Sequence, residues 1–209
     1  NIKGVELETG EIILGQKFII TTGTFMQAKI MVGDNIKLSG PDKQKPSLGL
    51  SPQLRELGFE TQRLKTGTPP RIKRGTVDFT KTEEHPGDAE ERCFSYDDIY
   101  YFDVDKQWPC YLTYTAPSTH RVILNNLELS SMYSGVVEGV GPRYCPSIED
   151  KLVRFKDKER HQIFLEPEGV NDHTVYPNGI STSLPEEVQW EYVRSIRGLE
   201  KAEILQPGY

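Results

Sequence analysis

The sequence predicts an α/β fold, with α+β as the alternative, because short apolar strand-like runs alternate with capped helical segments. An apolar run at 18–20 leads into a small-residue loop at 21–24, as in open α/β sheets that present backbone N–H groups to a ligand. A content of 36% hydrophobic residues, with 18 glycines and 14 prolines, indicates long ordered loops. At 209 residues the chain is long enough for one good core, or for one domain with part of another.

The N-terminal segments are predicted to form strands. Residues 5–9 alternate between apolar and polar, a Gly-Glu pair turns the chain, and 12–14 continue, which is typical of a β-hairpin. The strand expected at 18–20 ends in the loop at 21–24, and an ordinary strand-to-loop exit is the alternative to a ligand loop. Residues 33–49 are predicted to form a polar loop.

A helix and a basic loop follow. Ser51 is a suitable N-cap, Gly58 a suitable terminator, and 59–64 is compatible with a strand. The densest cluster of cations in this acidic chain comes next, in a loop stiffened by Pro69 and Pro70, and phosphate binding is one interpretation of it. A solvated charged face is the alternative. The residues proposed for nucleic-acid contact are Lys65, Arg71, Lys73 and Arg74.

The middle of the chain combines a polar excursion with a strand and a helix. Residues 78–92 are charged and expected to be exposed. The aromatic residues of 94–108 are able to stack on bases, but strand packing is the simpler explanation. A strand is predicted at 110–115, and a helix at 117–127.

The most informative run is 139–151, which combines glycines, prolines, an arginine, a tyrosine and a cysteine. Ser147 and Asp150 approximate a capping box, so a helix is predicted to begin here and to continue through Phe155. Cys145 is therefore expected just before a helix N-terminus and beside Arg143, a setting that favours the reactive thiolate. A structural cysteine in a tight turn is the alternative.

The C-terminal part repeats the alternation of strands and helices. A strand is predicted at 161–165, and the two carboxylates of 166–169 suit either acid–base chemistry or a solvated turn. A second capping box beginning at Ser183 is expected to open a helix that Gly198 ends. A last strand is predicted at 202–205.

Composition weighs against several classes of protein. The three cysteines are widely spaced without a CxxC, and the four histidines show no HxH or HExxH spacing, so neither a disulfide framework nor a metal site is expected. No run approaches the roughly 18 apolar residues of a membrane span, and no signal-peptide pattern is present. The default location is therefore the cytosol or an organelle matrix, and we expect the cytoplasm. The net charge of −6 argues against a surface that is basic all over, although a local patch remains compatible with nucleic acid.

Five blocks resemble, in order, the middle of the MnmG (GidA) family, flavin enzymes that modify the wobble uridine of tRNA. The blocks are 21–25, 64–71, 141–151, 161–169 and 179–185. The resemblance implies part of an FAD/NAD(P)-binding Rossmann-like domain at 1–28, and an inserted substrate and NADH-side domain at 29–209. In one interpretation of these boundaries, the last strand returns to the FAD domain. The chain begins without Met and ends without a tail, so it is interpreted as a fragment that is inactive alone.

The resemblance also implies a reaction. With the GTPase MnmE, and as a homodimer, the family places a carboxymethylaminomethyl or aminomethyl group on C5 of uridine 34 of tRNA. FAD is its redox cofactor, NADH its reductant and 5,10-methylenetetrahydrofolate its one-carbon source. A thiolate that adds to C6 makes C5 nucleophilic, and the family's motif cysteine falls on Cys145.

The resemblance assigns cofactor residues as well. The family's flavin-side positions fall on Ser47, Thr22, Gly23 and Thr24. Its nicotinamide-dinucleotide region falls on Gly141, Pro142, Arg143, Tyr144, Cys145, Pro146, Ser147, Ile148, Glu149, Asp150, Lys151, Leu152, Val153, Arg154 and Phe155. The family's GxGxxG flavin fingerprint is absent. The alternatives are a non-catalytic tRNA-binding module and a generic NAD-dependent oxidoreductase, which would need that fingerprint.

Overall fold

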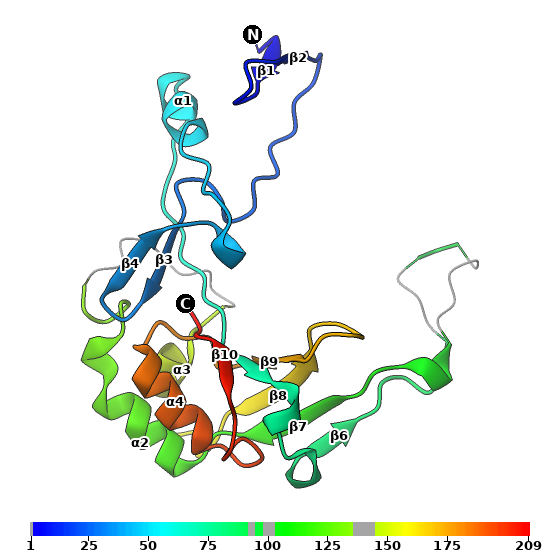
Figure 1. Cartoon of the computed structure of the whole chain (residues 1–209). Helices are drawn as coiled ribbons and strands as arrows, with labels where there is room; N and C mark the ends of the chain where they lie inside the picture. Colours follow the sequence, from blue (N-terminus) through cyan, green and yellow to red (C-terminus); the bar gives the residue numbers. More distant parts are fainter. Residues whose placement is uncertain (1, 92–94, 98–102, 136–144) are drawn as a thin grey trace. The chain divides into compact units, whose positions relative to one another are not determined.

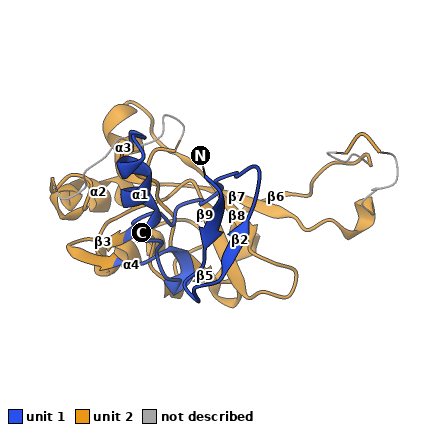
Figure 2. Ribbon diagram, turned by 90° about the horizontal axis from the view of Figure 1, so that it is seen from above, with its two compact units in different colours: residues 1–29, 38–60 blue, residues 30–37, 61–209 orange. Residues whose placement is uncertain are grey.

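A computed structural model describes residues 2–91, 95–97, 103–135 and 145–209 (Figure 1). The chain divides into two compact units. Unit 1 comprises 1–29 and 38–60, and unit 2 comprises 30–37 and 61–209 (Figure 2). The predicted strands at 18–20 and 59–64 are wrong, since neither segment forms a strand, although Leu64 takes part in a β-bridge.

A six-stranded antiparallel sheet organises unit 2. The strand order is β10-β5-β9-β8-β7-β6, and every pairing in it is antiparallel. The pairing of β7 with β8 joins Tyr111 to Leu165 and Tyr114 to Gln162, so residues of the predicted strands at 110–115 and 161–165 are neighbours. The strands are β5 (Arg71–Lys73), β6 (Glu83–His85), β7 (Cys110–Tyr114), β8 (Gln162–Pro167), β9 (Thr174–Asn178) and β10 (Ile204–Gln206).

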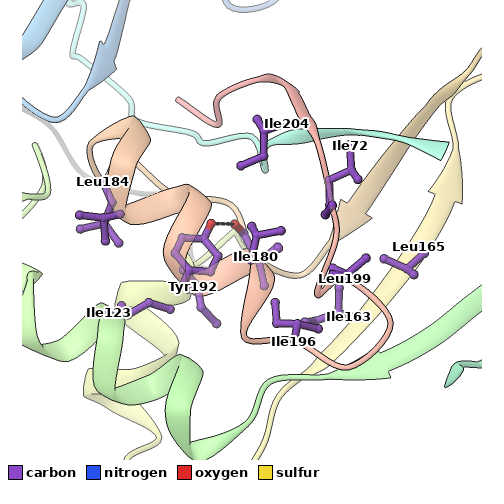
Figure 3. Packing of buried hydrophobic residues seen from close by; sticks show 14 of the residues in the cluster. Ile72, Ile123, Ile163, Leu165, Ile180, Leu184, Tyr192, Ile196, Leu199 and Ile204 are labelled. Atoms are coloured by element: carbon purple, nitrogen blue, oxygen red, sulfur yellow. Dashed lines mark hydrogen bonds between the residues drawn. The ribbon is translucent and has the colours of Figure 1, made fainter. Parts of the chain in front are cut away.

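Three helices supply the other side of the core of unit 2. They are α2 (Pro117–Asn125), α3 (Ile148–Arg154) and α4 (Glu186–Arg194), and all three were predicted. The alternation of β8 turns Ile163 and Leu165 into the core. Tyr192 of α4 is fully buried there and its hydroxyl donates to the Ile180 carbonyl, 3.4 Å away (Figure 3).

Unit 1 contains the predicted hairpin, β1 (Gly4–Glu6) with β2 (Ile12–Leu14), and the predicted helix α1 (Leu50–Glu56). The N-cap of α1 is Gly49 rather than Ser51, and Gly58 follows the helix with a φ of +88°, as a terminator does. Many large apolar side chains of unit 1 are exposed, Leu14 at 77% and Ile19 at 88%.

Two further sequence predictions are corrected. The polar segment 33–49 contains a strand, β4 (Asn35–Leu38), which pairs with β3 (Lys29–Val32) across a turn at Gly33, whose φ is +53°. The second capping box is wrong, because α4 begins after Pro185 and has no side-chain cap. The Ser183 hydroxyl is instead paired with that of Ser130, 2.9 Å away.

The mixed helix and strand content confirms the predicted fold class, in its α+β form because the large sheet is antiparallel. The assignment of 1–28 and 29–209 to an FAD-binding and an inserted domain stays a prediction. The last strand, β10, is an edge strand of the six-stranded sheet. None of the helices in the described ranges is long and apolar enough to cross a bilayer.

Candidate functional site

Cys145 lies where the sequence predicts it, immediately before α3. Its side chain is half-buried and its thiol is free. The Cys145 Sγ atom lies 3.6 Å from the Thr66 hydroxyl, which brings the predicted basic loop to the cysteine. Thr66 was not singled out from the sequence, since a threonine in a Thr-Gly-Thr run has no signal beyond its neighbours.

The predicted capping box at the start of α3 is confirmed. The Ser147 hydroxyl accepts a hydrogen bond from the Asp150 backbone N–H at 3.2 Å, and the Asp150 carboxylate accepts from the Ser147 N–H at 3.4 Å. That carboxylate also pairs with Lys65 at 3.3 Å and accepts from the Tyr133 hydroxyl at 3.2 Å. Burial, followed by the charge of Asp150, raises the pKa of Tyr133 to about 12, so the hydroxyl stays protonated and donates.

Glu149 is fully buried beside the cap and connects three segments of unit 2. Its Oε1 accepts from the Ser130 hydroxyl at 3.0 Å, the Thr182 hydroxyl at 2.9 Å and the Ser183 N–H at 3.1 Å. Oε2 has no hydrogen-bond partner among the described residues. The start of α3, and with it the backbone next to Cys145, is thereby tied to the loop before α4.

Two titratable side chains lie within electrostatic reach of Cys145. Burial lowers the pKa of Lys151, and a thiolate at Cys145 acts in the opposite direction. The Lys151 ammonium donates to the Gly179 carbonyl at 2.8 Å, which holds it in place. Burial raises the pKa of Tyr176, with Arg71 opposing and a thiolate at Cys145 adding to the shift.

The residues expected to contact NADH are divided by their burial. Residues 141–144, including Arg143, lie outside the described part of the chain. Ile148 and Leu152 pack in the core, and Glu149 and Asp150 are engaged within the protein. The members of the set that the described structure leaves at least partly accessible are Cys145, Pro146, Lys151, Val153, Arg154 and Phe155.

The four residues expected to contact flavin come together within unit 1. The Thr22 carbonyl accepts a hydrogen bond from the Phe25 N–H at 3.2 Å, and Gly23 has a left-handed conformation with a φ of +53°. Ser47 pairs with the same turn, because its N–H donates to the Phe25 carbonyl at 2.8 Å and its carbonyl accepts from the Gln27 N–H at 2.7 Å. Thr24 belongs to that turn, so hydroxyl groups distant in sequence share one small region.

The basic residues expected to contact nucleic acid are mostly neutralised within the protein. Lys65 pairs with Asp150, and Arg71 pairs with Glu168 at 2.7 Å. The other two are Lys73, which pairs with Glu203 at 2.8 Å, and Arg74, which lies 5.1 Å from the ring centroid of Trp108. Arg71 to Lys73 form strand β5 rather than a loop. The carboxylates that pair with Arg71 and Lys73 lie next to β8 and β10, far from them in the sequence.

The described part of the chain holds no group of three or more His, Cys, Asp or Glu side chains that could bind a metal ion. Sequence reasoning also missed a group of histidines and cations around α2. The Lys-Asp-Lys-Glu-Arg run at 156–160 was visible, but nothing in the sequence placed it opposite that helix.

Comparison with known proteins gives consistent matches. The model of the family described as "Glucose inhibited division protein A" matches residues 1–209. A protein of Geobacillus thermodenitrificans named "tRNA uridine 5-carboxymethylaminomethyl modification enzyme MnmG" is 55% identical over 207 residues, which are 99% of this chain and 33% of that protein. A protein of the same name from Bacillus subtilis is 53% identical with the same coverage.

A solved structure of Aquifex aeolicus GidA superimposes with a TM-score of 0.87 at 47% identity, covering 99% of this chain and 35% of that one. The chain therefore spans about a third of the length of the relatives that it matches. Since the family model covers every residue of the chain, the chain belongs to the glucose inhibited division protein A (GidA) family.

Proposed function

We propose that this chain is the thiol-bearing part of an FAD- and NADH-dependent enzyme that modifies C5 of the wobble uridine 34 of tRNA. The observation that carries the proposal is Cys145, a free and partly accessible thiol held before a capped helix, in a family whose curated relatives are named as tRNA uridine modification enzymes. The group added is carboxymethylaminomethyl or aminomethyl, and methylenetetrahydrofolate supplies the one-carbon unit.

Cys145 acts as the nucleophile in this proposal. The sulfur adds to C6 of uridine, and the electron pair of the C5–C6 double bond moves toward C5 and O4, so that C5 attacks the one-carbon electrophile. After loss of the C5 proton, tetrahydrofolate leaves from the new C5–CH2 group and an amine co-substrate adds to the resulting exocyclic methylene. Expulsion of the thiolate from C6 then restores the C5–C6 double bond. Lys151 lies within electrostatic reach of Cys145, and the Thr66 hydroxyl, 3.6 Å from the sulfur, is close enough to orient it.

The described residues fit contacts to the polar edges of a flavin. The turn at 22–24 offers hydroxyls and a left-handed glycine, and Ser47 pairs with it. The chain has no GxGxxG to hold a pyrophosphate. The rest of the flavin site then belongs to the two thirds of the relatives' length that this chain does not span. Bound FAD supplies redox chemistry, and Cys145 and Lys151 supply the covalent step.

The remaining parts of the proposal follow from the family resemblance. The full enzyme works in the cytoplasm as a homodimer with the GTPase MnmE, and NADH contacts the accessible members of 145–155. Since Ile148 and Leu152 are core residues, substitutions there are expected to unfold the protein rather than to weaken NADH binding selectively.

A graft tests the function. The 207 matching residues of the Bacillus subtilis relative are replaced by this chain, in cells that lack their own enzyme, and tRNA nucleosides are analysed by mass spectrometry. The graft is expected to restore the modified uridine, Cys145→Ser to abolish it with flavin retained, and Cys110→Ser to leave it intact. Cys110 is the matched control because it is also free and half-buried, but on β7.

The results of the graft distinguish the proposed roles of this chain. Normal modification by the Cys145→Ser graft would remove the nucleophile role and favour a non-catalytic tRNA-binding module. A wild-type graft that folds and binds flavin but restores nothing would refute the proposed activity.

A further inference from the structure

Unit 2 contains a concave region away from Cys145, here called the basic cleft. Its volume is about 1100 Å³. It is lined by the end of β7, by α2, by the segment 156–160 and by residues that follow α4. All of these segments belong to unit 2, and none of the lining residues is assigned above to a cofactor or to nucleic acid.

The floor of the basic cleft is held by internal hydrogen bonds. The Thr115 hydroxyl accepts from the His161 N–H at 2.8 Å and is paired with His120 Nε2 at 2.7 Å. The Thr113 hydroxyl donates to the Arg197 carbonyl at 2.9 Å. Because these hydroxyls are occupied within the protein, they fix the position of the walls, and the donors left for a ligand are the charged head groups around them.

Those head groups are cationic and lack carboxylate partners. The lysines and arginines that line the cleft are Arg121, Lys156, Lys158, Arg160 and Arg197. None of them forms an ion pair with a carboxylate in the described part of the chain. The three carboxylates of the lining include Glu200, which is paired with Lys81 at 3.2 Å, so an excess of positive charge remains. This excess stands out in a chain whose net charge is −6.

One further feature of the lining suits a nucleotide ligand. The Arg160 guanidinium lies 4.0 Å from the ring centroid of Tyr114, and a stacked guanidinium plane is a surface on which an RNA base can stack. His161, next to His120 with ring centroids 5.6 Å apart, has a buried Nε2 without a partner among the described residues. Burial lowers the pKa of both histidines, so near neutral pH the charge of the cleft comes from its lysines and arginines.

We propose that the basic cleft binds the phosphodiester backbone of RNA. This inference rests on the proposed function, because it names where a tRNA substrate is gripped. Phosphate contacts by unpaired lysines and arginines provide most of the affinity of proteins for nucleic acid. The cations predicted from the sequence are less suited to this role, since Lys65, Arg71 and Lys73 already neutralise carboxylates.

The test measures binding of a fluorescein-labelled anticodon stem–loop RNA to the 209-residue chain by fluorescence anisotropy over a range of salt concentrations. Lys156→Glu with Lys158→Glu is expected to weaken binding at least about tenfold at low salt, and to reduce the slope of log Kd against log[salt] by about 2. Lys17→Glu with Lys37→Glu is the matched control, since it makes the same charge change at exposed sites outside the cleft. It is expected to weaken binding less than about threefold.

Equal weakening by the two double variants would overturn the proposal, because net charge would then explain the effect. An unchanged Kd for the cleft variant would also overturn it. If the cleft variant keeps RNA affinity but loses binding of NADH, followed by NADH fluorescence, the cleft is a dinucleotide site instead. The proposed function is judged separately by the Cys145→Ser graft. If that graft loses the uridine modification while the cleft variant keeps its RNA affinity, only the proposal that the cleft binds RNA is refuted.

Discussion

Replacement of Glu149 by Ala is expected to be among the most destabilising single changes in the described structure. The side chain is 0% exposed and its Oε1 receives three hydrogen bonds. Without it, the Ser130 hydroxyl can still pair with Ser183, but the Thr182 hydroxyl and the Ser183 N–H lose their acceptor. Two unsatisfied buried donors cost about 1–3 kcal/mol each, and relief of the unpartnered Oε2 offsets part, so the expected loss is about 2–4 kcal/mol.

Urea unfolding followed by tryptophan fluorescence measures this loss, since Trp190 lies on α4 and packs against the core. Glu149→Gln keeps an acceptor at the Oε1 position and places an NH2 group at the unpartnered Oε2 position, so a loss of about 1–2 kcal/mol is expected. Glu187→Ala, an exposed change on α4, is the control and is expected to stay within about 0.5 kcal/mol. A loss below about 1 kcal/mol for the Ala variant, or equal losses for Gln and Ala, would refute the hydrogen-bond argument.

Three other changes test separate features by the same unfolding assay. Gly198→Ala should lower the free energy of unfolding by about 1–3 kcal/mol, because φ is +86° and the added Cβ would lie 2.9 Å from a methyl carbon of Thr82. Gly75→Ala is the control and should be nearly neutral, since the space around Gly75 is open. Ser147→Ala should cost about 1 kcal/mol through loss of the cap of α3, and a neutral result would mean that the backbone alone holds the helix start. Burial lowers the pKa of His120, which lines the cleft, and of the neighbouring His161 below the value in the unfolded chain. The unfolded state therefore binds more protons as the pH falls through about 6.5, and stability should decrease. His161→Phe should flatten that decrease, and an unchanged pH profile would contradict the assignment.

The candidate site combines short-range and long-range determinants. Ser147, Asp150 and Cys145 lie within six consecutive positions, so the cap and the place of the thiol follow from local sequence. Thr66 and Lys65 reach the same place from about 80 residues away, through the contacts of Cys145 and Asp150. No local pattern predicts such contacts, because they depend on how the segments pack in unit 2.

The pairing of the lysines and arginines also depends on long-range contacts. The sequence places Lys65, Arg71 and Lys73 in one cluster, for which phosphate binding and a solvated charged face are the two interpretations. The structure gives each of them a carboxylate from a distant segment, and it gathers unpaired cations at the basic cleft instead. Whether a cation is free to attract phosphate is therefore a property of the folded chain.

The sequence by itself determined the three helices of unit 2, the hairpin at the start of the chain, the strands β7 and β8, and the family, because caps, apolar periodicity and contiguous motifs are local. Only the tertiary structure decided that the large sheet is antiparallel, that the short strands β5 and β9 join it, and that the segments 18–20 and 59–64 form no strand of their own. A strand of three residues such as β5 has too little pattern to be recognised, and forms because β9 and β10 offer hydrogen-bond partners on both sides.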